Sequence, residues 1–534
     1  MLGLMMHRPL LVSSLIEHAD RHHGNTQIVS RSADGTIYHG TWHTTHQRCR
    51  KLANVLLGLG VAPGDRVGTL GWNHHRHLEA YYAISGMGAV CHTINPRLFP
   101  EQIAGIIQHA EDKILLVDPI FLPMLEELAP ELTHVTQVIV MDESGAALPP
   151  SVLPILAYET LLERVSGDYE WPEMDELTAA ALCYTSGTTG NPKGVLYSHR
   201  STLLHAWAVS LPDSLSFSAC DTVLPVVPLF HANAWGFPYA AALVGAKLVL
   251  PGPLLDGASL YQLLESEKVT LTAGVPTVWN NLMQYLQIEG RQLHHLKRLG
   301  VGGAACPKTI LSYFEDVQKV AVLPGWGMTE TSPVAALTLP KSHQSGLQGQ
   351  ARRDWLARSG RTLFGVDMEI IDDEGWPLPH DGQTFGHLMV QGHWVCNGYY
   401  KETADPLQKG WFPTGDVAVI DGEGFMQITD RAKDMIKSGG EWISSIELEQ
   451  VVIGYPAIRE AAVIGVHHPH WGERPLLLAV KNPGQEVTVD ELRTYLEQRI
   501  AKWWIPEQIE FVDSLPHTAT GKLNKAALRA QRGL

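Results

Sequence analysis

The stretch YTSGTTGNPKGV, residues 184–195, combines glycines, hydroxyl side chains and one lysine directly after the apolar run 179–183. The apolar run enters the loop as a buried strand would, and the glycines let the backbone approach a ligand closely. Hydroxyls beside a cation suit phosphate oxygens. We therefore expect this loop to hold the phosphates of a nucleotide triphosphate. Its candidate binding residues are Thr185, Ser186, Gly187, Thr188, Thr189, Gly190 and Lys193.

The loop is not the phosphate loop G-x-x-x-x-G-K-[ST]. Pro192 stands where the second glycine belongs, and Gly194 stands where the magnesium-binding hydroxyl belongs. The alternative is a Gly/Ser/Thr-rich surface linker. The buried strand expected before the loop argues against a linker, so phosphate binding is the favoured interpretation.

The composition is that of a large globular protein with several domain-sized units in 534 residues. A formal charge of −16 argues against nucleic acid as a partner, so a phosphate ligand requires a local cluster of donors. The six cysteines are far apart and form no C-x-x-C pair, which disfavours zinc frameworks and agrees with a reducing cytoplasm. No apolar run is long enough to span a membrane, and the N-terminus resembles an amphipathic helix more than a signal peptide. We expect a soluble protein.

Periodicity predicts an α/β fold. Helical and extended patterns alternate up to about residue 180 and again from 222 to about 322, which indicates two doubly wound subdomains. Short strands and glycine turns after about residue 364 predict a small β-rich subdomain. The C-terminal stretch reads as a compact α+β unit, with capping boxes at 444–447 and 488–491. We therefore expect a large N-terminal domain over residues 1–430 and a small one over 434–534.

A carboxylate and a guanidinium are expected to converge at the end of a hairpin. TGD at 414–416 and TDRAKD at 429–434 flank a turn near Gly422. Folding there places Asp416 roughly opposite Thr429 and brings Asp416 and Arg431 to the same end of the sheet. A carboxylate accepts from both hydroxyls of a ribose, and the arginine adds a contact. A purely structural ion pair is an equal alternative.

The segment GWGMTETSP, residues 325–333, places an aromatic ring, a hydroxyl and a carboxylate close together. Trp326 is a candidate wall of an adenine or acyl pocket, and Thr329 a donor to an α-phosphate. Glu330 is a candidate ligand of Mg²⁺, which prefers oxygen. The alternative is a helix N-cap followed by a carboxylate in the first turn.

Three further segments are ambiguous by themselves. Residues 226–250 place His231 and Trp235 among small side chains, which predicts an apolar tunnel or a buried helix leading to a strand. GVGGAACP at 300–307 is a weak dinucleotide fingerprint without the expected carboxylate, and its glycines let the backbone pass close to a flat ring. In LPHTATGKLNKAAL at 515–528, Lys522 is either a solvated lysine or a cation on a mobile loop.

These motifs occur in one order over nearly the whole chain. They are the loop at 184–195, PLFHANAW at 228–235, GWGMTE at 325–330, TGD at 414–416, DRAKDMIKSGGEWISSIELE at 430–449 and TATGK at 518–522. Together they resemble the adenylate-forming superfamily of acyl-CoA synthetases, peptide-synthetase adenylation domains and luciferases. Within it, the chain looks most like bacterial medium-chain and long-chain fatty acid-CoA ligases.

The resemblance implies an enzyme that uses ATP, Mg²⁺ and coenzyme A in two steps. The acid attacks the ATP α-phosphate to give acyl-AMP and pyrophosphate, and the thiol of CoA then displaces AMP. Lys522 would neutralise charge at the α-phosphate in the first step. Residues 431–433 would be a hinge centred on Lys433. Rotation there would withdraw Lys522 and bring Lys437 to the site for the second step.

The same matching assigns the remaining site residues. The nucleotide would contact Gly303, Ala304, Trp326, Gly327, Thr329, Asp416, Arg431 and Trp442, besides the phosphate loop. Mg²⁺ would be held by Thr185 and Glu330. The acyl group would contact Trp235, Val301, Gly302 and Gly327, with His231 beside its carboxylate. CoA would contact Gly439, Gly440 and Glu441.

Two positions narrow the expected substrate. Amino-acid-activating relatives carry an aspartate where this chain has His231, so a substrate ammonium would lie buried and unpaired here. Acetate-specific relatives have a tryptophan in place of Gly327, so the pocket is expected to be open. We expect a fatty acid, with medium chains favoured and long chains open.

The alternatives are a ligase for an aryl or methylthio-alkanoic acid, or a catalytically silent homologue. Retention of both Lys522 and Glu330 disfavours the silent homologue. The resemblance to long-chain ligases further indicates a homodimer. We expect a cytoplasmic location, with association at a membrane surface left open.

Overall fold

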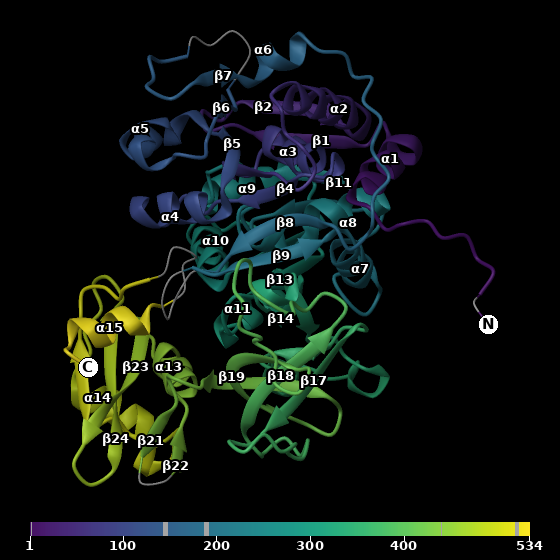
Figure 1. Ribbon diagram of the computed structural model, residues 1–534. Coiled ribbons are helices and arrows are strands. Elements are labelled where there is room, and N and C mark those ends of the chain that lie inside the picture. The colour runs from purple at the N-terminus through teal and green to yellow at the C-terminus, as the bar shows by residue number, and fades with distance from the viewer. Residues whose placement is uncertain (2, 143–147, 186–191, 439–440, 518–522) are drawn as a thin grey trace.

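The computed structural model describes residues 1, 3–142, 148–185, 192–438, 441–517 and 523–534. Figure 1 shows a large N-terminal domain and a small C-terminal domain beside it, with the C-terminal domain coloured yellow-green to yellow. Both are mixed α/β structures, as the sequence predicts. The boundaries at residues 430 and 434 stay a prediction.

The first sheet of the N-terminal domain is parallel except for its last pair of strands. Its order is β7 (Ile155–Ala157), β6 (Gln137–Val140), β5 (Asp112–Val117), β3 (Arg66–Leu70), β4 (Val90–Thr93), β8 (Ala179–Tyr184) and β9 (Gly194–Ser198). The predicted phosphate loop therefore connects β8 to its antiparallel neighbour β9.

The second sheet is larger and changes from antiparallel to parallel at β14, which pairs parallel with β13 and antiparallel with β15. Its order is β17 (Val366–Ile371), β18 (Gly386–Gly392), β19 (Phe412–Ile420), β20 (Phe425–Arg431), β16 (Gly360–Thr362), β15 (Val334–Leu337), β14 (Ala321–Gly327), β13 (Arg298–Val301), β12 (Leu271–Gly274), β10 (Thr222–Pro225), β11 (Lys247–Leu250), β1 (Gln27–Arg31) and β2 (Ile37–Thr41).

This arrangement differs from the predicted one in two respects. The β-rich region is continuous with the second α/β sheet through β14, because that strand hydrogen-bonds on both sides. The N-terminal strand β1 pairs parallel with β11, so the start of the chain belongs to the second sheet. Pairing of distant segments carries no local sequence signal, which is why periodicity did not predict either feature.

Helices cover both sheets of the N-terminal domain. They are α1 (Val12–His23), α2 (Trp42–Gly58), α3 (His75–Gly86), α4 (Pro100–Ala110), α5 (Leu122–Leu128), α6 (Tyr158–Glu163), α7 (His199–Ser210), α8 (Phe237–Val244), α9 (Gly257–Ser266), α10 (Pro276–Ile288), α11 (Lys308–Ser312) and α12 (Gly349–Leu356). One large apolar cluster combines side chains of both sheets, such as Val67 and Leu248, with helix residues such as Leu52 and Ile84. The two sheets therefore share a core.

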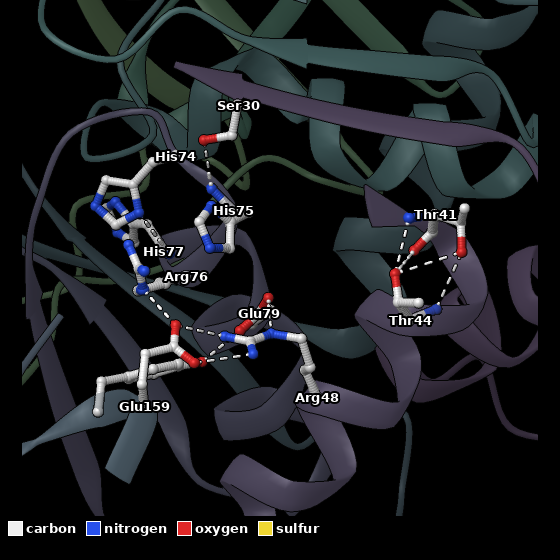
Figure 2. A network of polar contacts seen from close by, with 11 residues as sticks. Ser30, Thr41, Thr44, Arg48, His74, His75, Arg76, His77, Glu79 and Glu159 are labelled. Atoms are coloured by element: carbon white, nitrogen blue, oxygen red, sulfur yellow. Dashed lines mark hydrogen bonds and ion pairs between the residues drawn. The ribbon is translucent and has the colours of Figure 1, made fainter. Parts of the chain in front are cut away.

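A buried polar network stabilises the helix layer at the N-terminal end of this domain (Figure 2). Nε of Arg48 in α2 donates to Glu79 in α3 at 2.7 Å, and the same guanidinium binds both carboxylate oxygens of Glu159 in α6 at 2.9 and 3.0 Å. The Glu79 side chain is fully buried, so its charge requires this partner. The backbone N–H of His75 donates to Ser30 of β1 at 3.1 Å, which links α3 to the second sheet.

The C-terminal domain has a separate sheet and separate apolar clusters. Its strands run in the order β22 (Glu441–Ile443), β21 (Ile436–Ser438), β24 (Gly472–Lys481) and β23 (Ile458–His468), with β25 (Gln508–Phe511) paired to β24. The helices are α13 (Ser445–Ile453), α14 (Val489–Glu497) and α15 (Lys525–Gln531). Ser444 and Thr488 cap α13 and α14, as the sequence predicts.

Candidate active site

A cavity of about 1130 Å³ opens at the carboxyl ends of the parallel strands β8, β12 and β13. Open α/β sheets bind ligands at this position. The apolar part of the lining, called the inner wall, consists of buried residues and includes Leu215, Ala273, Gly300, Leu323 and Leu337. The polar part, called the outer wall, includes the partly or fully exposed Gln102, His109, Lys193, Thr329 and Glu402 together with the buried Glu330. The cavity therefore suits a ligand with a charged head and an apolar tail.

Most of the predicted site residues that the structure describes line this cavity. They are Thr185, Lys193, His231, Trp235, Val301, Gly302, Gly303, Trp326, Gly327, Thr329, Glu330, Arg431 and Lys433. These residues come from segments more than 200 positions apart, so the fold converges them as the motif order predicts. Their roles stay predictions.

Other predicted residues lie elsewhere. Ala304, Asp416 and Lys437 are not on the cavity wall, and Ala304 and Lys437 are exposed. Glu441 and Trp442 belong to β22 in the C-terminal domain. The remaining ones lie outside the described residues: Ser186, Gly187, Thr188, Thr189, Gly190, Gly439, Gly440 and Lys522.

The turn that carries Thr329 and Glu330, η5 (Thr329–Thr331), is fixed by groups from distant segments. The hydroxyl of Tyr197 in β9 donates to the carbonyl oxygen of Thr329 at 2.6 Å. The hydroxyl of Tyr399 donates to Oε1 of Glu330 at 2.8 Å, and the backbone N–H of Cys396 donates to its carbonyl oxygen at 2.8 Å. Burial and the nearby Glu330 carboxylate raise the pKa of Tyr399. The phenol therefore stays protonated and holds the carboxylate in place.

Lys193 places a cation at the mouth of the cavity. Its Nζ lies 3.2 Å from Oε2 of Glu402 and 4.5 Å from the centroid of the Tyr399 ring. The base of the phosphate loop is closed by two bonds between Thr185 and Lys193, N–H to carbonyl at 2.9 Å and N–H to Oγ1 at 3.2 Å. These bonds fix the backbone of Lys193, while its side chain is partly exposed.

Asp416 and Arg431 form the predicted pair with a different register. A bulge between Val417 and Ala418 places Asp416 opposite Arg431, and not opposite Thr429 as expected from the sequence. Nε of Arg431 lies 2.8 Å from Oδ1 of Asp416, and Nε1 of Trp326 donates to Oδ2 at 3.0 Å. Asp416 is only 4% exposed, so it lies behind the wall formed by the arginine and the indole.

The segment that leads to Trp235 has an unusual backbone. Residues Ala232, Asn233, Ala234 and Trp235 have φ of 42°, 52°, 49° and 55°. Such left-handed backbone costs roughly 1–2 kcal/mol at each non-glycine residue. The carboxamide of Asn233 holds the turn by accepting from the hydroxyl of Tyr81 at 3.4 Å and donating to that of Tyr239 at 3.5 Å. The turn presents His231 and Trp235 to the cavity.

Two cavity glycines are required by packing. A Cβ on Gly302 would lie 2.9 Å from Cη2 of Trp235, so the indole packs against the backbone there. A Cβ on Gly327 would lie 1.9 Å from the carbonyl oxygen of Pro333. A tryptophan at position 327 would therefore displace backbone before it entered the cavity, and Gly327 alone does not explain why the cavity is open.

The predicted Mg²⁺ ligands offer the oxygen atoms that this cation prefers. The carboxylate of Glu330 and the hydroxyl of Thr185 are hard oxygen donors, and both residues line the cavity. No group of three or more His, Cys, Asp or Glu side chains in the described part of the chain could hold a metal by itself. Mg²⁺ usually takes one or two carboxylates together with substrate phosphates. The donor set therefore fits Mg²⁺ bound jointly with ATP.

The sequence did not reveal the side chains that position the predicted ligands. Tyr197 and Tyr399 lie 132 and 69 residues from the groups they bind. Tyr399 lies outside the motifs named above, Tyr197 follows the phosphate loop by two residues, and Asn233 lies within PLFHANAW without a role that the motif assigns to it. Only their contacts identify them, because a hydrogen bond between distant segments leaves no spacing pattern.

The chain belongs to the AMP-binding enzyme family. The family model described as AMP-binding enzyme matches residues 15–400, and its C-terminal domain model matches residues 447–522. The sequence-based assignment to the adenylate-forming superfamily is thereby confirmed.

Curated relatives match over almost their whole length. A medium-chain-fatty-acid-CoA ligase of Ectopseudomonas oleovorans is 49% identical over 100% of this chain and 98% of its own. A 3-methylmercaptopropionyl-CoA ligase of Ruegeria lacuscaerulensis is 49% identical over 99% and 98%. A long-chain-fatty-acid-CoA ligase of Thermus thermophilus is 47% identical over 99% and 96%.

A solved structure supports the fold. The anthranilate CoA ligase in complex with anthranoyl-AMP superposes with a TM-score of 0.88, covers 98% of both chains and is 24% identical. In the described part of the chain, no helix combines the length and the apolar character needed to cross a bilayer.

Proposed function

We propose that this chain is an ATP-dependent fatty acid-CoA ligase. An oxygen of the fatty acid carboxylate attacks the ATP α-phosphorus, and the bond to pyrophosphate breaks, giving acyl-AMP. The sulfur of CoA then attacks the acyl carbon, and AMP leaves. The observation that carries the proposal is a single cavity whose lining combines polar side chains, such as Lys193 and Glu330, with buried apolar ones, such as Ala273 and Leu337.

The residues on the wall have distinct roles in this proposal. Thr329 donates to the α-phosphate, and Lys193 attracts the outer phosphates. Glu330 and Thr185 would hold Mg²⁺, which when bound would neutralise charge on the phosphates. Tyr399 keeps the Glu330 carboxylate oriented through its 2.8 Å hydrogen bond, so the ligand is pre-organised before ATP binds.

The acyl end of the site has its own residues. His231 stands at the carboxylate, and Trp235 covers the backbone of Gly302 beside the apolar inner wall. Each methylene buried there contributes about 0.8 kcal/mol. The chain length of the substrate should therefore be limited by the inner end of the cavity.

A methylthio-alkanoic acid is a second candidate, because the 3-methylmercaptopropionyl-CoA ligase is as similar as the medium-chain ligase. Acids from acetate to palmitate, 3-methylthiopropionate and cinnamate should be compared by kcat/KM with ATP, Mg²⁺ and CoA. We expect a rise with each methylene up to medium length. If kcat/KM were highest for 3-methylthiopropionate and did not rise along the straight-chain series, the substrate would be a methylthio-alkanoic acid and not a fatty acid.

The inner wall gives a sharper version of this experiment. Ala273 is fully buried on that wall, and Ala273→Met adds bulk where the acyl tail should end. We expect lower kcat/KM for the longest acids and little change for butyrate, which serves as the internal control. An equal loss for all lengths would place the acyl tail elsewhere.

The place of the reaction is also part of the proposal. Free cysteines, several of them buried, support a reducing cytoplasm. A homodimer rests on the resemblance to long-chain ligases alone.

A further inference from the structure

The two domains share no apolar core in the described part of the chain. The apolar clusters of the C-terminal domain contain only residues from Ile436 onward, and those of the N-terminal domain end at Ile428. A junction without a shared apolar core allows relative motion of domains, so polar contacts decide which arrangement is populated.

A small group of polar contacts spans this junction. Oδ2 of Asp430, at the end of β20, accepts the backbone N–H of Ser445 at 2.6 Å and its hydroxyl at 2.5 Å. The hydroxyl of Ser444 donates to the carbonyl oxygen of Thr429. Asp430 is 1% exposed, and its carboxylate faces the first turn of α13, where the helix dipole favours a negative charge. The end of β20 is thereby attached to the start of α13.

The contact continues into α15. Nζ of Lys525 donates to the hydroxyl of Ser445 and lies 2.7 Å from Oε1 of Glu449. Burial raises the pKa of Asp430 and of Glu449, so both depend on the buried ammonium and their hydrogen-bond donors to stay charged. Lys525 begins α15 and follows the predicted catalytic Lys522 by three residues. The network therefore joins β20 to the helix that follows Lys522.

The predicted hinge lies inside this network. Asp430 precedes Lys433, whereas Ser445, Glu449 and Lys525 follow it. Rotation about Lys433 would separate Asp430 from Ser445. By contrast, Asp434 follows the hinge and pairs with Arg529 of α15 at 2.6 Å, so both partners of that pair would move together.

The present arrangement suits the first of the two proposed steps. Lys433 lines the cavity, while Lys437, the residue expected at the site in the second step, does not. The side chain of Lys437 is exposed, and its backbone N–H donates to Glu473 within the C-terminal domain. A contact that stabilises this arrangement should therefore favour acyl-AMP formation.

We propose that Asp430 is a positioning residue that latches the C-terminal domain, through Ser445 and Lys525, in the arrangement used for acyl-AMP formation. The proposal rests on the proposed ligase function and adds a residue that does not line the cavity proposed to bind the substrates. It predicts that loss of the latch changes the ratio of the two half-reactions, since the latch contributes to one arrangement only.

The kinetic experiment measures the two half-reactions separately in Asp430→Ala and Asp434→Ala. Pyrophosphate release without CoA reports the first, and acyl-CoA formation from supplied acyl-AMP reports the second. We expect Asp430→Ala to slow the first about ten-fold, the effect of losing a charge-assisted hydrogen bond, with less change in the second. Asp434→Ala is the matched control, and the ratio of its two rates should stay that of the wild type.

A second readout does not depend on activity. Spin labels at Glu289→Cys and Glu497→Cys, both exposed and one in each domain, report the distance between the domains in a Cys220→Ser background. We expect a new distance population in Asp430→Ala and none in Asp434→Ala. If wild-type protein released no pyrophosphate with any acid, the ligase function would fail, yet the distances would still decide the latch.

Two results would contradict the role proposed for Asp430. An unchanged ratio of half-reactions together with an unchanged distance distribution in Asp430→Ala would reduce Asp430 to a structural helix cap. If Asp430→Ala did not fold, Asp430→Asn preserves the volume and one acceptor oxygen while removing the charge. Equal ratios and distances for Asp430→Asn and wild type would show that the charge has no part in the latch, which would contradict the proposal.

Discussion

The N-terminal domain positions its site residues with buried contacts, whereas the C-terminal domain reaches the site through a polar junction. Thr329 and Glu330 are fixed by Tyr197, Tyr399 and Cys396 from separate segments. The predicted residues of the C-terminal domain that are described, such as Lys437, are off the cavity wall. The N-terminal domain therefore supplies the described cavity wall, and under the proposed function the C-terminal domain has to move to contribute its residues.

The largest effect should come from the lysine assigned to the moving domain. Lys522→Ala removes a cation from the α-phosphate, and we expect acyl-AMP formation to fall by about a hundred-fold or more. Thioester formation from supplied acyl-AMP should be nearly unchanged. Pyrophosphate release and acyl-CoA formation measure the two steps. Lys481→Ala, which removes a lysine that pairs with Glu486 and lies 4.6 Å from the ring centroid of Phe511, is the matched control. Equal loss in both steps would contradict the division of labour between the domains.

A smaller effect is expected at the preformed pocket. Asp416→Ala removes the partner of Arg431 and Trp326 and the predicted ribose contacts, worth about 1.5–3 kcal/mol each. The KM for ATP should rise at least ten-fold, while the KM for the fatty acid changes little. Asp421→Ala breaks the Arg358 pair at the other end of the same hairpin and serves as control. If the variant folded and its KM for ATP were unchanged, the ion pair of Asp416 with Arg431 would have only a structural role.

The smallest effect concerns stability. Burial lowers the pKa of His205 to about 3 and those of His77 and His199 to about 4, all in the N-terminal domain. The unfolded chain binds their protons near pH 6.5, so each histidine lowers the stability as the pH falls from about 6.5 toward its folded value. Each contributes a slope of up to about 1.4 kcal/mol per pH unit.

Urea unfolding between pH 5 and 7.5 measures this slope. His205 accepts a hydrogen bond from the backbone N–H of Val334 at 3.1 Å, and a glutamine offers an acceptor without titrating. His205→Gln should therefore flatten the slope without unfolding the protein. If both proteins gave the same slope of unfolding free energy against pH, the pKa of His205 would not differ between the folded and unfolded states.

Local sequence patterns predicted the motifs and the helix caps. They did not predict contacts between residues that are far apart in the sequence. Helix caps at Ser444 and Thr488 were predictable because capping depends on residues three apart. The expected Asp416 register was wrong by two residues: one comes from the exact centre of the turn and one from the bulge, which has no fixed sequence signal. The left-handed turn before Trp235 was missed, because alanines rarely adopt positive φ and only the surrounding contacts hold them there.

The central claim is that one cavity forms acyl-AMP and then acyl-CoA. The most direct measurement mixes enzyme, ATP, Mg²⁺ and a radiolabelled medium-chain fatty acid without CoA, quenches the mixture, and then repeats it with CoA added. The account predicts about one equivalent of acyl-AMP and one of pyrophosphate per cavity, followed by conversion to acyl-CoA and AMP. ADP with phosphate, or acyl-CoA without prior acyl-AMP, would contradict it.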